Sequence, residues 1–274
     1  MKKTVSIVIP TLNAEKGIKD CINNIKKQNY KDIEIIVVDS FSKDNTTKIA
    51  KKCGVKVIQT KWKLFGARYL GVMAATGKIV IFIDVDQLFQ RNNVIREIIE
   101  MMEKNDMLIL DEASYKPSNF LEKLTSADRK LVHKLYNIHM NPIYGVLRPR
   151  AYNKTFLVNV LKGIEIEKLK DIVIYDDAII YYEASKYSKK IGFVKNAIFQ
   201  KEVSSIKELV IHTYKYGKTA RRLSISKEYK NILNKKSTFR KGSFRYGNIW
   251  LSIQSDIFLL IKGFGFTLGY WINR

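Results

Sequence analysis

The chain has 274 residues, of which 46% are hydrophobic and 4 are prolines. That composition supports a folded core of one large or two small domains and excludes a disordered chain. Cys21 and Cys53 show neither metal-ligand nor redox spacing, which favours a reduced, cytoplasmic protein. No apolar signal core follows Met1-Lys2-Lys3, so we do not expect secretion.

The net charge is +23, and it is unevenly distributed along the chain. Residues 204–274 contain 14 lysines and arginines against three acidic residues, a local balance of +11. Such an excess indicates a polyanionic partner, either an anionic membrane surface or a nucleic acid. A solvated basic face without a partner is the alternative.

Apolar runs and helical periodicity alternate through the first 110 residues. They predict strands at 5–9, 33–38, 55–58, 79–83 and 107–110, separated by helices at 15–27, 43–52, 65–76 and 94–103. This alternation predicts an α/β fold, in which a mostly parallel sheet is flanked by helices and joined by right-handed crossovers.

The pattern changes after residue 110. We expect helices at 118–138, 153–162 and 176–189, and strands at 144–147, 191–195 and 197–202. From residue 204 onward the chain has the pattern of helices that mix basic and aromatic residues. We therefore expect one compact domain, 1–203, with halves 1–110 and 111–203, followed by a helical extension, 204–274.

Residues 249–272 are the most apolar part of this extension, although Asp256 and Lys262 interrupt them. A membrane-spanning helix needs about 20 mostly apolar residues. An amphipathic helix that lies on a membrane surface, with basic residues on either side of it, fits the pattern better. A helix packed on the rest of the protein is the alternative.

Two carboxylates, Asp84 and Asp86, follow the apolar run 79–83 directly. Such a run is typical of a strand buried on both faces, and open α/β sheets bind ligands beyond the carboxyl ends of these strands. With only Val85 between them, both carboxylates can reach one divalent cation, Mg²⁺ or Mn²⁺, which often bridges substrate phosphates. A polar strand end leading into a turn is the structural alternative.

Polar residues also follow the first two predicted strands. Pro10, Thr11 and Asn13 form a turn whose backbone can lie against a base or ribose. Asp39, which can accept a hydrogen bond from such a ligand, and Ser42 begin the loop after the second strand. Because the carboxyl ends of parallel strands meet at one edge of the sheet, these loops converge with the acid pair. The convergence indicates a nucleotide site, although each loop alone is a weak signal.

The predicted helix at 65–76 contains Arg68 and Gly71. Arg68 can place a fixed positive charge near phosphates, and Gly71 permits close packing of the helix on the sheet. A surface arginine on an amphipathic helix is the alternative.

Together these segments resemble the nucleotide-sugar-binding half of family 2 glycosyltransferases, which have the GT-A fold. The order and spacing match over about residues 4–90, in the motifs Ser6-Ile7-Val8-Ile9-Pro10-Thr11-Leu12-Asn13, Val38-Asp39-Ser40-x-Ser42-x-Asp44-x-Thr46, Ala67-Arg68-x-x-Gly71 and Phe82-Ile83-Asp84-Val85-Asp86. The resemblance implies a UDP- or GDP-sugar donor, with Asp39 and the first loop at the nucleoside. It implies that Asp84 and Asp86 lie at the ribose and the metal, with Asp86 the more direct ligand.

The sequence departs from the family's motifs at three positions. Members usually have a second acid and a glycine where Ser40 and Phe41 stand, and an asparagine where Tyr69 stands. These departures concern the identity of the donor nucleotide more than the fold.

The second half resembles the family less closely. Members usually carry an acidic pair at a helix start, and its second residue is the catalytic base. This pattern assigns the base to Asp177, with Asp176 as its neighbour, because an acceptor hydroxyl must lose a proton as it attacks. A simple helix cap is the alternative. Arg129, Arg148 and Arg150 lie in the region where the family binds acceptors.

A polyprenyl phosphate acceptor would change this logic. Its oxygen is already largely ionised near neutral pH, because the second pKa of a phosphate ester is about 6. A base then matters less, and guanidinium groups that bind the phosphate matter more. The basic, aromatic C-terminal segment also resembles the membrane-associated tail of enzymes that use lipid-linked acceptors.

The sequence therefore predicts an inverting, metal-dependent hexosyltransferase that works peripherally at the cytoplasmic face of a membrane on a lipid-linked acceptor. A transferase with a soluble glycan acceptor and an inactive nucleotide-sugar binder are the nearest alternatives. A nucleic-acid-binding protein is suggested by charge alone. Against it, no nucleic-acid motif is present, and acidic strand ends repel phosphates unless a metal is bound.

Overall fold

The computed structural model describes residues 5–136, 147–225, 229 and 249–272. The chain divides into two compact units. The sheet unit contains Met1–Glu112, Arg148–Ile172 and Ile180–Gln200, and the helical unit contains Ala113–Leu147, Val173–Ile179 and Lys201–Arg274. The helical unit thus combines the predicted extension with two earlier segments of the chain.

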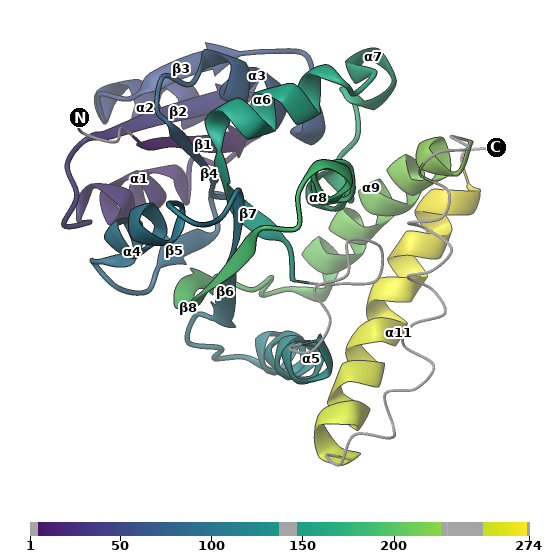
Figure 1. Ribbon diagram of the computed structural model, residues 1–274. Coiled ribbons are helices and arrows are strands. Elements are labelled where there is room, and N and C mark those ends of the chain that lie inside the picture. Colours follow the sequence, from purple (N-terminus) through teal and green to yellow (C-terminus); the bar gives the residue numbers. More distant parts are fainter. Residues whose placement is uncertain (1–4, 137–146, 226–228, 230–248, 273–274) are drawn as a thin grey trace. The chain divides into compact units, whose positions relative to one another are not determined.

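One eight-stranded sheet forms the centre of the sheet unit. Its strands are β1 (Val5–Thr11), β2 (Ile33–Asp39), β3 (Lys56–Gln59), β4 (Ile79–Phe82), β5 (Gln87–Phe89), β6 (Met107–Ser114), β7 (Pro149–Asn153) and β8 (Ile191–Gln200). They are ordered β3-β2-β1-β4-β7-β6-β8-β5 (Figure 1). The first four in this order are parallel, whereas β7 is antiparallel to β4 and β6, and β5 is antiparallel to β8. The α/β fold is confirmed, and the four strands of the first half are parallel as predicted. The sheet as a whole is mixed and not mostly parallel, because the strands of the second half join it in antiparallel pairs.

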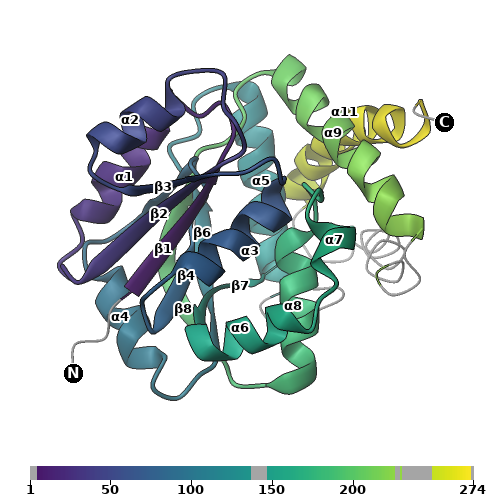
Figure 2. The ribbon, with the colours of Figure 1, turned by 90° about the horizontal axis from the view of Figure 1, so that it is seen from above.

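Helices cover both faces of the parallel strands. They are α1 (Ile18–Lys26), α2 (Thr46–Lys52), α3 (Leu64–Ala74), α4 (Val94–Met101), α6 (Lys154–Lys162) and α7 (Ile166–Leu169), and α8 (Asp176–Tyr187) belongs partly to each unit. Helices α1 and α2 lie on one side of β1 and β2, and α3 lies on the other (Figure 2). Every residue of β1 and β4 is buried, which explains why β4 is apolar throughout and why β1 has only two polar side chains, those of Ser6 and Thr11.

The contact between α3 and β1 depends on Gly71. A Cβ atom at this position would lie 2.2 Å from Cγ1 of Val8, so any larger residue would push the helix away from the sheet. This agrees with the close helix–sheet packing predicted for Gly71. The same packing sets the position of Arg68, one turn earlier on α3.

Several elements differ from the prediction. Pro10 lies inside β1 and does not end it. The strand expected at 144–147 falls mostly outside the described residues, and the strand found nearby is β7, which contains Pro149 and Arg150. The two short strands expected at 191–202 are the single strand β8. Strand β5 and helix α7 were not predicted, because three or four residues are too few to show a periodic pattern.

The helical unit contains α5 (Phe120–Tyr136), α9 (Ile206–Ile225) and α11 (Ile249–Trp271), and α11 packs against the other two. A Cβ atom on Gly217 of α9 would lie 2.0 Å from the carbonyl oxygen of Phe266, and one on Gly269 of α11 would lie 1.9 Å from that of Tyr214. These glycines let the two helix backbones touch.

Candidate active site

The carboxyl ends of three neighbouring strands lie at one edge of the sheet. Thr11 at the end of β1 is paired with Asp39 at the end of β2. On the other side of β1, Val8 is paired with Phe82, two residues before Asp84. The strand register therefore brings the predicted donor residues to the same edge.

The carboxylate of Asp39 holds the loops after β1 and β2 together. The residue is fully buried. Its Oδ1 accepts hydrogen bonds from Oγ1 of Thr11 at 3.0 Å and from Oγ of Ser42 at 2.5 Å, and its Oδ2 accepts one from the backbone N–H of Ser42 at 2.9 Å. These contacts give Asp39 a structural role in the loop, and its contact with a base or ribose stays a prediction.

Asn13 completes the link between the two loops. Its backbone N–H donates to Oγ of Ser42 at 2.8 Å, and its side-chain oxygen accepts from the N–H of Lys43 at 2.8 Å. Asn13 and Phe41 both adopt left-handed backbone conformations, with φ of 52° and 55°. The two loops are thus fixed to each other in the protein alone.

Asp84 lies between two arginines. Its Oδ1 is 2.8 Å from an Nη atom of Arg68, and its Oδ2 is 3.1 Å from one of Arg150. The Arg68 side chain is 3% exposed, and its guanidinium carbon lies 5.1 Å from the centre of the Phe82 ring. Nε of Arg150 also donates to Glu112 of β6 at 2.5 Å. Each Asp84 oxygen therefore pairs with a guanidinium, and both arginines take part in a charge cluster in which Arg68 is buried and the other members are half-buried.

Asp86 is the exposed member of the acid pair. Desolvation by the surrounding protein, followed by repulsion from the Asp84 carboxylate, raises the pKa of Asp86 to about 7. A hydrogen bond from Gln200 and the charge of Arg150 act in the opposite direction. Protein atoms around the carboxyl desolvate it, but the side chain as a whole is exposed, so a cation can reach Asp86. A bound cation would offset the repulsion between the two carboxylates.

Two glutamines that the sequence analysis did not identify position this acid pair. The backbone N–H of Asp84 donates to Oε1 of Gln87 at 2.9 Å, and Nε2 of Gln87 donates to Oε1 of Gln200 at 3.0 Å. Since Oε1 of Gln200 is an acceptor, its amide NH₂ faces Asp86 as a donor. Gln87 and Gln200 are paired across β5 and β8, and neither a short strand nor a long-range pairing has a sequence signal.

Asp176 and Asp177 begin α8, as predicted. Asp176 is buried and Asp177 is half-buried, and Oδ1 of Asp177 accepts a hydrogen bond from the N–H of Ala178 at 2.8 Å. Carboxylates in the first turn are favoured by the helix dipole, so this geometry is also what a simple helix cap would show. The role of Asp177 as a base stays a proposal.

The three arginines predicted at the acceptor differ in their surroundings. Nε of Arg129 pairs at 2.9 Å with Glu202, whose side chain is 5% exposed and also accepts from Ser114. Arg150 belongs to the cluster around Asp84, and Arg148 is half-buried. Arg129 and Arg150 thus hold carboxylates in the structure.

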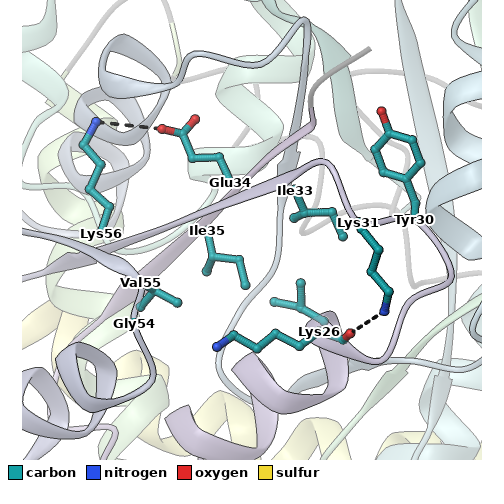
Figure 3. A pocket seen from close by; sticks show the side chains of 10 residues that line it. Lys26, Tyr30, Lys31, Ile33, Glu34, Ile35, Gly54, Val55 and Lys56 are labelled. Carbon is teal, nitrogen blue, oxygen red and sulfur yellow. Dashed lines mark hydrogen bonds and ion pairs between the residues drawn. The ribbon is translucent and has the colours of Figure 1, made fainter. Parts of the chain in front are cut away.

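A cavity of about 380 Å³ lies at the amino end of β2, away from the acid pair (Figure 3). Its lining includes Lys26, Lys31 and Lys56, and Lys56 is 3.9 Å from Glu34. None of the residues predicted for the donor lines this cavity, so it is separate from the candidate site.

The acid pair fits a cation whose remaining ligands are phosphate oxygens of the donor. Among the residues described by the structure, no three His, Cys, Asp or Glu side chains form a metal-binding group. Mg²⁺ and its relatives are commonly held by one or two carboxylates together with substrate phosphates. Asp86 provides such a carboxylate beside one that arginines already neutralise.

The parallel sheet and its acidic strand end define a GT-A-type protein. The chain belongs to glycosyl transferase family 2, whose model matches residues 6–173. It is 30% identical over 214 residues to the glycosyltransferase GlyG of Streptococcus pneumoniae, a match that covers 73% of this chain and 70% of GlyG. It is 31% identical to the Escherichia coli UDP-Glc:alpha-D-GlcNAc-diphosphoundecaprenol beta-1,3-glucosyltransferase WfgD, over 37% of this chain and 42% of WfgD.

The fold is similar to that of mannosyltransferase PcManGT from Pyrobaculum calidifontis, solved with GDP-Man and Mn²⁺. The TM-score is 0.58 at 15% identity, and the match covers 96% of this chain and 76% of that one. The recognition of a family 2 glycosyltransferase from the sequence motifs is confirmed.

Proposed function

We propose that the chain transfers a hexose, with inversion, from a UDP- or GDP-sugar to an acceptor linked to a membrane lipid. The observation that carries this proposal is the division of roles at the end of β4. Asp84 pairs with Arg68 and Arg150, whereas Asp86 is exposed beside it. Asp84 thus holds the site together, and Asp86 is available to bind a cation that also contacts the donor's diphosphate.

The proposed metal is Mg²⁺ or Mn²⁺, held by Asp86. When bound, the cation would offset charge on the departing nucleoside diphosphate. Gln200 donates a hydrogen bond to Asp86 and is held by Gln87, and the cluster of Asp84, Arg68 and Arg150 fixes the start of the turn that contains Asp86. The Mn²⁺ in the PcManGT structure supports this assignment.

Asp177 is the proposed base. A carboxylate within hydrogen-bond reach of an acceptor hydroxyl can take its proton as the oxygen attacks the anomeric carbon. Asp176 precedes it, buried in the first turn of α8. If the acceptor is a phosphate, its oxygen is already ionised, and Asp177 becomes less important than the arginines.

A lipid-linked acceptor is supported by two observations. The name of WfgD describes transfer to a diphosphoundecaprenol-linked sugar. Helix α11 exposes an apolar stripe formed by Trp250, Ile253, Ile257, Leu260 and Phe264, at spacings of three and four residues, and by Trp271 two turns further on. An apolar stripe on a helix of a strongly basic segment suits the surface of an anionic membrane.

By length and composition, helix α11 could also cross a membrane. It is the one helix among the described residues that is long and apolar enough to do so. Its neighbours favour a helix lying in the membrane surface. Lys215 and Lys218 of α9 are exposed, and they flank the backbone contact between Gly217 and α11. A spanning α11 would carry these lysines into the hydrocarbon, where charges are strongly disfavoured.

The decisive experiment screens UDP- and GDP-sugars with Mg²⁺ or Mn²⁺ against a membrane lipid extract and follows sugar into the organic phase. We expect transfer by the wild-type protein and none by Asp86→Asn or after chelation. Asp177→Asn separates the acceptor classes, since it should abolish transfer to a hydroxyl and spare transfer to a phosphate. Transfer to water-soluble acceptors alone would reject the lipid acceptor, and activity of Asp86→Asn equal to wild type would reject the site.

A further inference from the structure

Phe41 combines exposure with an unusual backbone. Its side chain is 50% exposed in the loop after β2. Its φ of 55° lies in the left-handed region, where bulky residues are rare and glycine is unstrained. This is also a place where the family's motif usually has a glycine. The chain therefore exposes an aromatic ring on a backbone conformation that favours glycine.

The neighbouring residues hold this conformation. The N–H of Ser40 donates to the carbonyl of Thr11 at 2.8 Å, and its hydroxyl donates to the carbonyl of Trp62 at 2.8 Å. On the other side, Ser42 is bound through both its N–H and its hydroxyl to Asp39. Strained residues that their surroundings fix in this way occur preferentially at ligand sites.

The position of Phe41 in the sheet suggests the ligand. Strand β1 lies between β2 and β4, so at the usual strand spacing the ends of β2 and β4 are about 10 Å apart. Asp84 and Asp86 follow β4, and Phe41 follows β2. A nucleoside diphosphate carries its diphosphate and its base on opposite sides of a ribose, so a donor whose diphosphate lies at the acid pair can reach Phe41 with its base.

The exposed apolar surface at that end matches a base better than a sugar. Leu12, which follows β1, is 49% exposed, and Phe41 is 50% exposed. The carboxylate of Asp39, at the start of the same loop, is fully buried and bound to Thr11 and Ser42. A flat aromatic side chain beside a buried polar network offers stacking as the available contact.

We infer that Phe41 is a stacking platform for the nucleobase of the sugar donor. This inference rests on the proposed function, because it assumes a nucleoside-diphosphate donor at the acid pair. Stacking uses the π-face that every base has, so Phe41 would add affinity for a base of either kind. The ring thus supplies nucleoside binding at a position where glycine can supply none.

The test measures the dissociation constants of UDP, GDP and ribose 5-diphosphate by calorimetry in the presence of Mn²⁺. For the nucleotide that the wild-type protein binds, Phe41→Ala should raise the dissociation constant about tenfold, which is within the range of base–aromatic stacking. The dissociation constant of ribose 5-diphosphate should not change. Phe41→Trp should retain affinity. The matched control is Phe120→Ala, which removes a ring that is 68% exposed in the helical unit and should change none of the three constants.

Phe41→Gly provides a second, independent measurement. Glycine adopts the left-handed conformation without strain, so this variant should melt at a higher temperature than Phe41→Ala while binding nucleotide as weakly. Unchanged nucleotide affinity in both variants would overturn the inference, and so would an equal loss for ribose 5-diphosphate. If UDP or GDP binds in a Phe41-dependent way but no sugar is transferred, the proposed function fails and the stacking role stands.

Discussion

Removing the amide of Gln200 should weaken the binding of metal and leave the fold intact. Gln200 donates to Asp86 and receives the hydrogen bond of Gln87 at 3.0 Å. In Gln200→Leu the side chain keeps a similar size but no longer donates. The Asp86 carboxylate then loses the group that orients it, while the pairing of β5 with β8 is preserved by backbone hydrogen bonds.

The size of this effect follows from the place of Gln200 behind the proposed ligand. A hydrogen bond to a charged group contributes about 1.5–3 kcal/mol, and loss of a residue that orients a metal ligand typically weakens metal binding about 10- to 100-fold. Gln200 is half-buried and Asp86 is exposed, so solvent replaces part of the lost bond. We therefore expect the lower end, about tenfold weaker binding.

The assay titrates Mn²⁺ into the protein with UDP or GDP present and measures free Mn²⁺ by electron paramagnetic resonance. Gln254→Leu is the control, because Gln254 is half-buried like Gln200 but belongs to α11 in the helical unit. Excess Mn²⁺ should restore turnover in Gln200→Leu but not in Asp86→Asn. A Mn²⁺ affinity within twofold of wild type in Gln200→Leu would refute the role of the glutamine pair.

Two further changes test the charge cluster and the apolar stripe. Arg150→Met should lower the free energy of unfolding by about 3 kcal/mol, because it leaves Glu112 and Asp84 without their shared guanidinium. Thermal melting measures this loss, and the exposed control Arg96→Met should show no comparable change. Ile257→Glu on α11 should reduce flotation with anionic vesicles about tenfold, whereas Ile211→Glu on α9, of similar exposure, should not. Equal flotation of both glutamate variants would contradict the proposed membrane-facing stripe.

The sequence was most informative about the parallel half of the sheet. Continuous apolar runs identified β1, β2 and β4 because strands buried on both faces tolerate few polar residues. Their alternation with helices predicted that they are parallel, so that their carboxyl ends lie at one edge. The loops that follow β1 and β2 therefore lie at the edge of the sheet where the sequence pattern predicts them.

The charge relations inside the site were not predictable in the same way. The sequence suggested Arg68 as a contact for phosphates and Arg150 as a contact for the acceptor, but both pair with Asp84. Arg150 reaches it from β7, a strand antiparallel to β4, and its other partner, Glu112, comes from β6. Pairings between residues separated by 38 to 66 positions depend on sheet topology, which local patterns do not encode.

The departures from the family's motif after β2 have a common physical basis. The hydroxyl of Ser40 donates to the carbonyl of Trp62, and Phe41 keeps the left-handed backbone that glycine would adopt. The loop is linked through Ser42 to Asp39, and it has a hydroxyl and an aromatic ring where the family's motif usually has an acid and a glycine. Loss of the acid lowers the negative charge beside a ligand that is itself anionic, and the ring adds apolar surface. Both changes favour binding through the base, so donor recognition in this chain should depend more on stacking than on carboxylate hydrogen bonds.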